Sequence, residues 1–279
     1  MRTKIALLAV IALPVALAGC GASDTSTAKT SAASLSLPAD AGHVHGIVRS
    51  PKGDLLIGTH AGVFTPGADG AFTRIGDAAD YMGLAFLPTG SLLSSGHPAP
   101  GSNEPNPLGL RQSRDDGTTW TTVTQIPRDD YHVIETGGGR IYAVGSNGAM
   151  YAGGAPTTMV AIGAAPAGLI DLAVAPARGS SLLASTQSGL LRSRDGGRTW
   201  TPVGDGVGLL SWVRSDAVFL VDAAGAVSMS ADDGASWSAR GTIGAPPAGL
   251  LATSASELVA ADHEGRILTS DDGGRNWSS

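Results

Sequence analysis

An eight-residue pattern that recurs four times constrains the fold of this chain more than any other feature. Each copy has the form Ser-x-Asp-x-Gly-x-(Thr, Ser or Asn)-Trp. The copies occupy residues 113–120, 193–200, 230–237 and 270–277. They are spaced by about 40 residues, or by twice that distance between the first two, and such a period is typical of β-propellers and solenoids.

A glycine upstream of each copy extends the period to two further units in which the pattern itself is missing. The six glycines are Gly62, Gly109, Gly148, Gly189, Gly225 and Gly265. Each unit also divides into four short apolar runs, as in "LIDLAV", "SLLAST", "GLLRS" and "TWTPV" of the fourth unit. Four short strands make one propeller blade. The sequence therefore predicts an all-β, six-bladed β-propeller with four-stranded antiparallel blades over residues 41–279.

The repeated turn is interpreted as a structural element that joins the third and fourth strands of a blade. Its Asp can accept hydrogen bonds from nearby backbone N–H groups, its Gly permits a positive φ, and its Trp can bury its ring beside the next sheet. The residues given this role are Asp115, Asp195, Asp232 and Asp272, with Trp120, Trp200, Trp237 and Trp277. The pattern resembles the Asp-box, or BNR, repeat of sialidases and sortilin-type receptors. That resemblance, over residues 43–279, implies that the turns lie on the face away from an active site.

The N-terminus has the layout of an export signal. Two basic residues precede an apolar run from Ile5 to Ala18, which is short for a membrane span. The run ends in "LAGC", which resembles the lipobox of bacterial lipoproteins and implies lipidation of Cys20, the only cysteine of the chain. We therefore expect a signal peptide at 1–19, a lipidated Cys20 with a flexible tether at 20–40, and a protein anchored to a membrane of the bacterial cell envelope. A cleaved export signal with an incidental Cys20 is the alternative.

Composition excludes some classes of function. The formal net charge is −6, whereas a general nucleic-acid-binding protein carries a basic face, so no nucleic-acid partner is expected. A single cysteine also leaves no disulfide within the chain and no Cys-x-x-Cys metal site.

All six histidines are predicted to lie on the propeller face opposite to the repeated turns. In an antiparallel four-stranded blade, the start of the first strand and the loop after the second strand share one face. The histidines at these positions are His43, His45, His60, His97, His132 and His263. Aligning the blade starts "HGI", "MGL", "HVI" and "DLA" places His45, Met82, His132 and Asp171 at equivalent positions, which would form a ring around the axis.

This ring is a candidate metal or ligand site. Histidine with methionine suits copper, and histidine with aspartate suits zinc or iron. His43 and His45, two residues apart on a strand, would point to the same side and could share one ion. The candidate ligands are His43, His45, His60, His97, His132, Met82 and Asp171, with copper or zinc as the candidate ion. The alternative for each is a hydrogen-bonding or packed residue at a strand end.

Phrases such as "HVHGI", "GTHAGVF", "YMGLAF" and "DYHVI" look like those of a group of bacterial lipoproteins commonly labelled glycosyl hydrolase or sialidase-like. Sialidases clamp the substrate carboxylate with three arginines, because guanidinium groups bind carboxylates bidentately. Only Arg128 clearly falls on the histidine face, so sialidase activity is not expected. Other glycosidases use two carboxylates, for which Asp130 and Asp171 are the candidates.

Three classes of function remain open. The sequence favours a lipid-anchored binding or assembly module whose histidine-lined mouth holds a transition metal or a small ligand. The first alternative is a carbohydrate-active enzyme that uses carboxylates of the same face. The second is a passive propeller that binds an envelope protein or a glycan.

Overall fold

The structure is a computed structural model that describes residues 35–279. The expected signal peptide at 1–19, Cys20 and the tether up to residue 34 lie outside the described residues. From residue 35 on, the chain forms 23 β-strands and one short 3₁₀ helix, η1 (Pro156–Thr158). None of the described residues belongs to a helix of the length and hydropathy needed to cross a membrane.

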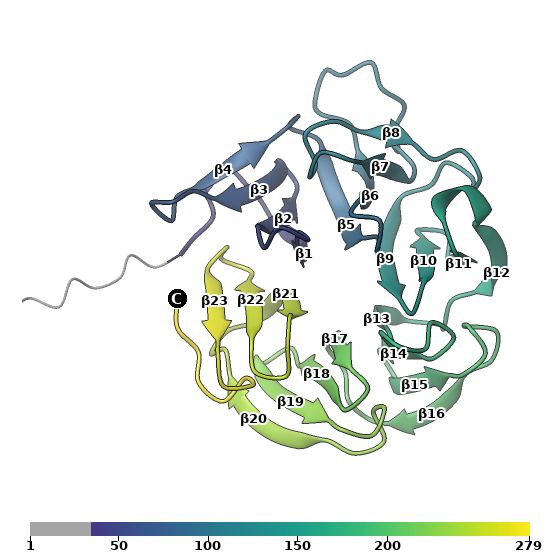
Figure 1. The fold of residues 1–279 in the computed structure, drawn as a ribbon, viewed down its shortest axis with the longest axis vertical. Helices are drawn as coiled ribbons and strands as arrows, with labels where there is room; N and C mark the ends of the chain where they lie inside the picture. Colours follow the sequence, from purple (N-terminus) through teal and green to yellow (C-terminus); the bar gives the residue numbers. More distant parts are fainter. Residues whose placement is uncertain (1–34) are drawn as a thin grey trace, which may run out of the picture. The chain divides into compact units, whose positions relative to one another are not determined.

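The strands form six antiparallel sheets around a central axis, and each sheet uses its strands in sequence order (Figure 1). The first sheet consists of β1 (Val44–Arg49), β2 (Leu55–Thr59), β3 (Gly62–Pro66) and β4 (Phe72–Ile75). The second consists of β5 (Asp80–Phe86), β6 (Leu92–His97), β7 (Arg111–Ser113) and β8 (Thr121–Thr122). The third consists of β9 (Tyr131–Gly137), β10 (Arg140–Gly145), β11 (Ala149–Gly153) and β12 (Val160–Ala164).

The remaining sheets continue the ring. The fourth sheet consists of β13 (Leu169–Val174), β14 (Leu182–Thr186), β15 (Gly189–Ser193) and β16 (Thr201–Gly204). The fifth consists of β17 (Leu209–Arg214), β18 (Ala217–Val221), β19 (Ala226–Ser230) and β20 (Ser238–Thr242). The sixth consists of β21 (Pro247–Ala252), β22 (Leu258–Asp262) and β23 (Ile267–Ser270). The first strand of each sheet lies nearest the axis, and β21 contacts β1 to close the ring. The predicted six-bladed propeller is confirmed.

Both ends of the described chain complete the sixth sheet. Ser36 forms an antiparallel bridge with Arg266, and Ser278 forms one with Thr269, so the two ends share the position of a fourth strand beside β23. Leu37 is buried in the adjacent hydrophobic cluster. Ser36 and Leu37, which the sequence assigned to the tether, therefore contact the propeller.

The repeated turns have one common geometry. In residues 193–200, Ser193 Oγ accepts a hydrogen bond from the Gly197 N–H at 2.8 Å, and Asp195 Oδ1 accepts one from the Thr199 N–H at 3.0 Å. The indole N–H of Trp200 donates to the Gly197 carbonyl at 3.1 Å. The other three turns repeat these contacts. Each of the four aspartates therefore accepts a backbone hydrogen bond within its own turn.

Each repeated turn packs against the sheet that precedes its own. A Cβ on Gly197 would lie 3.0 Å from Cε of Met150 in the third sheet, and the φ of 85° at this position also favours glycine. Trp200 joins the same cluster, which contains Tyr142 and Met150. The turns of the second, fifth and sixth sheets cover the first, fourth and fifth sheets in the same way. The turns thus fasten neighbouring blades.

Candidate functional site

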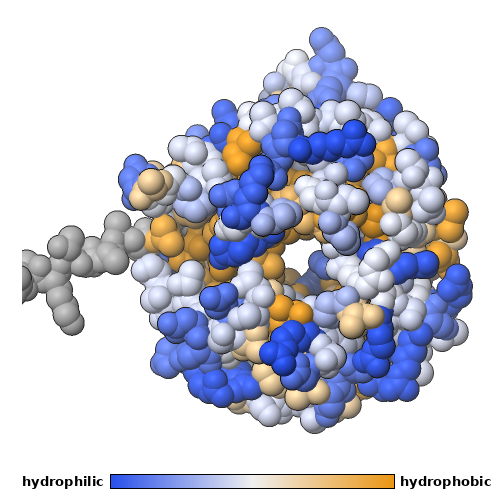
Figure 2. All heavy atoms as spheres, viewed as in Figure 1, coloured by the Kyte–Doolittle hydropathy of each residue, from blue (hydrophilic) through white to orange (hydrophobic). Residues whose placement is uncertain are grey.

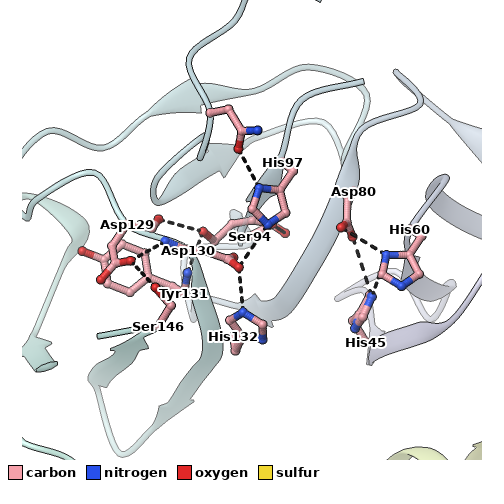
Figure 3. A network of polar contacts seen from close by, with 12 residues as sticks. His45, His60, Asp80, Ser94, His97, Asp129, Asp130, Tyr131, His132 and Ser146 are labelled. Carbon is pink, nitrogen blue, oxygen red and sulfur yellow. Dashed lines mark hydrogen bonds and ion pairs between the residues drawn. The ribbon is translucent and has the colours of Figure 1, made fainter. Parts of the chain in front are cut away.

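A cluster of imidazole and carboxyl groups lies on the face opposite to the repeated turns (Figure 3). The sheet topology places the starts of the first strands and the loops after the second strands on this face. All six histidines occupy such positions, as predicted. Four of them form two groups, one around Asp80 (His45 and His60) and one around Asp130 (His97 and His132).

The first strands are bulged where they carry histidines. Five of the six innermost strands have a register shift close to their first residue. His45 is the extra residue of β1, and His132 is the extra residue of β9. A β-bulge changes the direction of the side chains beside it. The bulges can therefore direct both imidazoles to the channel at the centre of the ring, and both residues line the mouth of that channel.

The predicted ring of equivalent positions is correct for His45 and His132 but wrong for Asp171. In β13 the extra residue is Ile170, and Asp171 pairs with Ser185, one step deeper along the strand. The sequence alignment slipped by one residue because the bulge cannot be seen in the sequence. Met82 belongs to the corresponding bulge of β5, but its side chain is buried, with 8% of its surface exposed.

Three potential ligand atoms converge beside β1. His45 Nε2 lies 3.3 Å from His60 Nδ1, and His60 Nδ1 lies 3.1 Å from Asp80 Oδ2. His45 Nε2 is also 3.7 Å from Asp80 Oδ1. Residues from two neighbouring sheets therefore form one group that could hold a metal ion.

Protons alone do not satisfy this group. If His60 Nδ1 carries a proton and donates it to Asp80, His45 Nε2 faces an N–H group that is already engaged, at 3.3 Å. Asp80 Oδ1 is buried and has no hydrogen-bond partner among the described residues. A cation between the three side chains would bind the lone pairs of both imidazoles and an oxygen of Asp80 at once.

The protonation state of His45 fits the role of a ligand. Burial lowers the pKa of His45 to about 4, and this effect outweighs the opposing charge of Asp80. The imidazole is consequently neutral at pH 7, and its lone pair is available to a metal.

The second group is centred on Asp130. Its Oδ2 lies 2.6 Å from His132 Nε2 and 3.2 Å from His97 Nε2. Burial opposes the charge of Asp130, but the hydrogen bonds and charges of His132 and His97 outweigh it and lower the pKa of Asp130. The hydrogen bond to Asp130 in turn raises the pKa of His132. Asn106 Oδ1 lies 2.7 Å from His97 Nδ1 and holds the other side of that ring.

His43 and His263 border the first group without joining it. The ring of His43 meets those of His60 and His263 edge-on, with centroid distances of 5.6 Å and 5.9 Å. The group of converging ligand atoms contains neither residue. The expected sharing of one ion by His43 and His45 is therefore not supported, and His60 and Asp80 stand beside His45 instead.

The axial channel contains two carboxyl groups below the histidines. A cavity of about 150 Å³ forms its mouth and is lined by His45, His132, Glu135 and Asp171 together with aliphatic side chains. Figure 2 shows the opening at the centre of the ring. Glu135 also lines the next cavity along the axis, of about 250 Å³.

The two channel carboxyls differ in their hydrogen bonding. Asp171 accepts hydrogen bonds from the backbone N–H groups of Leu172 at 2.8 Å and Leu210 at 2.7 Å, so it ties the fourth sheet to the fifth. Burial raises the pKa of Asp171 to about 6. Burial, with a smaller contribution from Asp171, raises the pKa of Glu135 well above its usual range. Asp171 is accordingly a structural residue in this geometry.

Asp80 is the candidate ligand that the sequence analysis did not name. The signal that could have identified it is its place at the start of β5, level with the histidines that begin or follow neighbouring strands.

Comparisons with known proteins support the fold. No protein-family model matches the chain, and no curated protein matches it. Among solved structures, YCF48 from Cyanidioschyzon merolae is 14% identical with a TM-score of 0.56, over 88% of this chain and 86% of that one. A structural genomics protein of unknown function from Bacteroides thetaiotaomicron is 11% identical with a TM-score of 0.65, over 85% and 74%.

A glycosidase also has the same fold in part. The GH74 enzyme of Niastella koreensis is 16% identical with a TM-score of 0.59, over 85% of this chain but 37% of that one. YCF48 has also been solved bound to a D1 peptide, and that structure is 15% identical with a TM-score of 0.58, over 85% and 95%. At these identities the comparisons establish the fold alone, which is a β-propeller.

Proposed function

We propose that this chain is an exported, lipid-anchored binding module whose histidine face holds one zinc ion through His45, His60 and Asp80. The observation that carries the proposal is the convergence of His45 Nε2, His60 Nδ1 and the Asp80 carboxylate. Two ligand atoms at about 2.0–2.1 Å from a tetrahedral zinc ion lie about 3.3–3.4 Å apart. The distance of 3.3 Å between the two imidazole nitrogens equals that spacing, and the distances of 3.1 Å from His60 to Asp80 Oδ2 and 3.7 Å from His45 to Asp80 Oδ1 lie close to it.

The donor set favours zinc over copper. Two imidazoles and one carboxylate are ligands that zinc accepts, whereas the case for copper rested on a thioether ligand from Met82. Met82 is buried and lies outside the group of converging atoms. Three protein ligands also leave a fourth tetrahedral position open for a water molecule or a ligand group, as in catalytic and ligand-binding zinc sites.

The remaining parts of the proposal rest on the sequence and on fold neighbours. Export and lipidation at Cys20 rest on the signal-like N-terminus and "LAGC". The geometry of the repeated turns supports their resemblance to Asp-box repeats. A binding role for the propeller is in keeping with YCF48, whose structure with a D1 peptide shows that such a fold can bind a protein segment.

The glycosidase alternative receives less support from the geometry. Asp130 is bound by two histidines, and Asp171 accepts two backbone hydrogen bonds. Both carboxyls are thus engaged in contacts within the propeller. The likeness to the GH74 enzyme concerns the fold alone.

Elemental analysis of the full-length chain, purified without chelators or a polyhistidine tag, tests the metal site. We expect an equimolar amount of zinc in the parent protein and little in a His60→Ala, Asp80→Asn double variant. His263→Ala is the matched control, because it removes a histidine of the same face that is not a ligand. Copper in place of zinc would correct the choice of ion, and equal metal in parent and double variant would refute the site.

A further inference from the structure

One buried carboxyl group of the axial channel has no partner in the described part of the protein. Glu135 lies in β9, three residues along the strand from His132, and it lines both cavities of the channel. Its carboxyl group forms no hydrogen bond and no ion pair with any of the described residues 35–279. A buried polar group without a partner destabilises a protein. Glu135 therefore offers a ligand in the channel an acceptor that none of these residues uses.

Asp171 of the neighbouring sheet adds a second carboxyl group to the mouth cavity. Its two oxygens each accept one backbone hydrogen bond, from Leu172 and from Leu210. A carboxylate oxygen has two lone pairs, so both oxygens can accept a further hydrogen bond. The charge of Asp171 also contributes to the raised pKa of Glu135, in keeping with the position of the two carboxyl groups in one cavity. Two such charges oppose each other unless a cation lies between them.

The described chain supplies no cation at this place. Apart from the two carboxyl groups, the ionisable side chains that line the two cavities are His45, His132 and Arg49. Burial lowers the pKa of His45 to about 4, which leaves this imidazole neutral at pH 7. His132 pairs with Asp130 at 2.6 Å, and the exposed Arg49 donates to the Gly53 carbonyl at 2.8 Å. Among residues 35–279, the channel carboxyl groups therefore have no counter-ion.

The rest of the mouth cavity favours an organic cation over a hard metal ion. Its described lining has no side-chain oxygen other than those of Glu135 and Asp171, whereas calcium and magnesium take about six or more oxygen ligands. A primary ammonium group has three N–H donors, which two carboxyl groups can accept. The volume of about 150 Å³ equals the share of about five water molecules, which suits a short alkylamine. Most of the remaining lining is aliphatic and could bury the alkyl chain, and it includes Ile47, Leu84, Ile134, Leu209, Leu210 and Leu250.

We propose that the axial channel binds the primary ammonium group of a small alkylamine between Glu135 and Asp171. The amine enters in its charged R–NH₃⁺ form, and its alkyl chain lies against the aliphatic lining. Because burial and Asp171 raise the pKa of Glu135, this acid gives its proton to the solvent when the ammonium group binds. No other bond forms or breaks. His60 and Asp80 do not line the cavity, so this site is separate from the zinc site.

Isothermal titration calorimetry of the full-length protein with n-butylammonium chloride tests the site. We expect a single saturable site and a release of protons, which titrations in two buffers of different ionisation enthalpy measure. Glu135→Gln should weaken binding by about tenfold or more, because it removes a charged hydrogen-bond acceptor. The same variant should release no proton on binding. n-Butanol has the same alkyl chain without the charge and should show no saturable binding.

Glu264→Gln is the matched control, because Glu264 is an exposed carboxyl group of the histidine face that lies outside the channel lining. We expect it to bind the amine as the parent does. The His60→Ala, Asp80→Asn double variant should also bind the amine, which separates this site from the zinc site. Equal affinity and equal proton release in Glu135→Gln and parent would overturn the proposal. So would the absence of saturable binding at millimolar amine, or tighter Glu135-dependent binding of calcium chloride.

Discussion

His45 Nε2 and Asp80 Oδ1 lie 3.7 Å apart, although they belong to the innermost strands of two different sheets. His60, from the loop after β2, completes the group with its Nδ1 atom 3.3 Å from His45 Nε2. These contacts exist only when the first and second sheets are packed side by side. A metal that binds this group must therefore bind the folded chain and not the unfolded one.

Zinc should consequently stabilise the protein against heat. Free zinc at about 100 times its Kd adds about 2.7 kcal/mol to the free energy of unfolding when it binds only the folded state. Differential scanning calorimetry with and without zinc measures the shift in Tm. The shift should vanish in His60→Ala and persist in His263→Ala, and a shift of equal size in both variants would point to zinc bound elsewhere.

Asp130 should control the protonation of His132. The hydrogen bond from His132 Nε2 to Asp130 raises the pKa of His132, so the stabilisation from this pair is present below pH 6.5. It is lost as the pH rises through the raised pKa of the folded state. An NMR titration should show that Asp130→Asn lowers the pKa of His132. An unchanged titration curve would mean that Asp130 does not carry the charge that His132 senses.

Asp171 should matter for stability and not for metal content. Asp171→Ala leaves the buried N–H groups of Leu172 and Leu210 without an acceptor, which costs about 1–3 kcal/mol for each such group. Urea unfolding measures this loss, and elemental analysis should find the parental zinc content. A variant with parental stability and no metal would return Asp171 to the candidate ligands.

The pKa of Asp171 also predicts a pH dependence. Burial raises this pKa to about 6, whereas the unfolded chain titrates at about 3.9. The folded state therefore binds one more proton than the unfolded state between these values, and this carboxyl makes the protein more stable as the pH falls from 7 to 4. The same unfolding series, repeated across this range with Asp171→Asn, isolates the contribution, which should be absent in the variant.

The repeated turns should make the fold sensitive to stronger acid. Hydrogen bonds from Ser236 and Asn276, side chain and backbone, are the main cause that lowers the pKa values of Asp232 and Asp272 to about 2. Their contribution to stability is present above about pH 4 and is lost as the pH falls toward 2. Asp232→Asn should lower Tm at pH 7 and reduce the loss of Tm between pH 4 and pH 2. Parallel curves for variant and parent would contradict this role.

The repeats made the fold predictable, because a turn that recurs with a fixed period implies identical sheets. The same regularity placed the histidines on one face and identified Asp115, Asp195, Asp232 and Asp272 as structural. The face of the histidines and the role of the aspartates both follow from the order of the strands within a sheet, and the period of the repeat gives that order.

The geometry of the site could not be predicted to the same depth. The bulges in β1, β9 and β13 leave no mark in the sequence, so Asp171 was aligned with His45 although Ile170 occupies that position. Asp80 joins His45 and His60 through packing between sheets, and no spacing along the chain reveals such a contact. Burial of Glu135 in the channel is likewise a property of the closed ring.

Anomalous diffraction at the zinc absorption edge, from crystals of the zinc-loaded protein, tests the central claim most directly. The account predicts one strong peak at about 2.0–2.2 Å from His45 Nε2, His60 Nδ1 and an oxygen of Asp80. A peak at His97 and His132 instead, or no peak on the histidine face of fully loaded crystals, would contradict it.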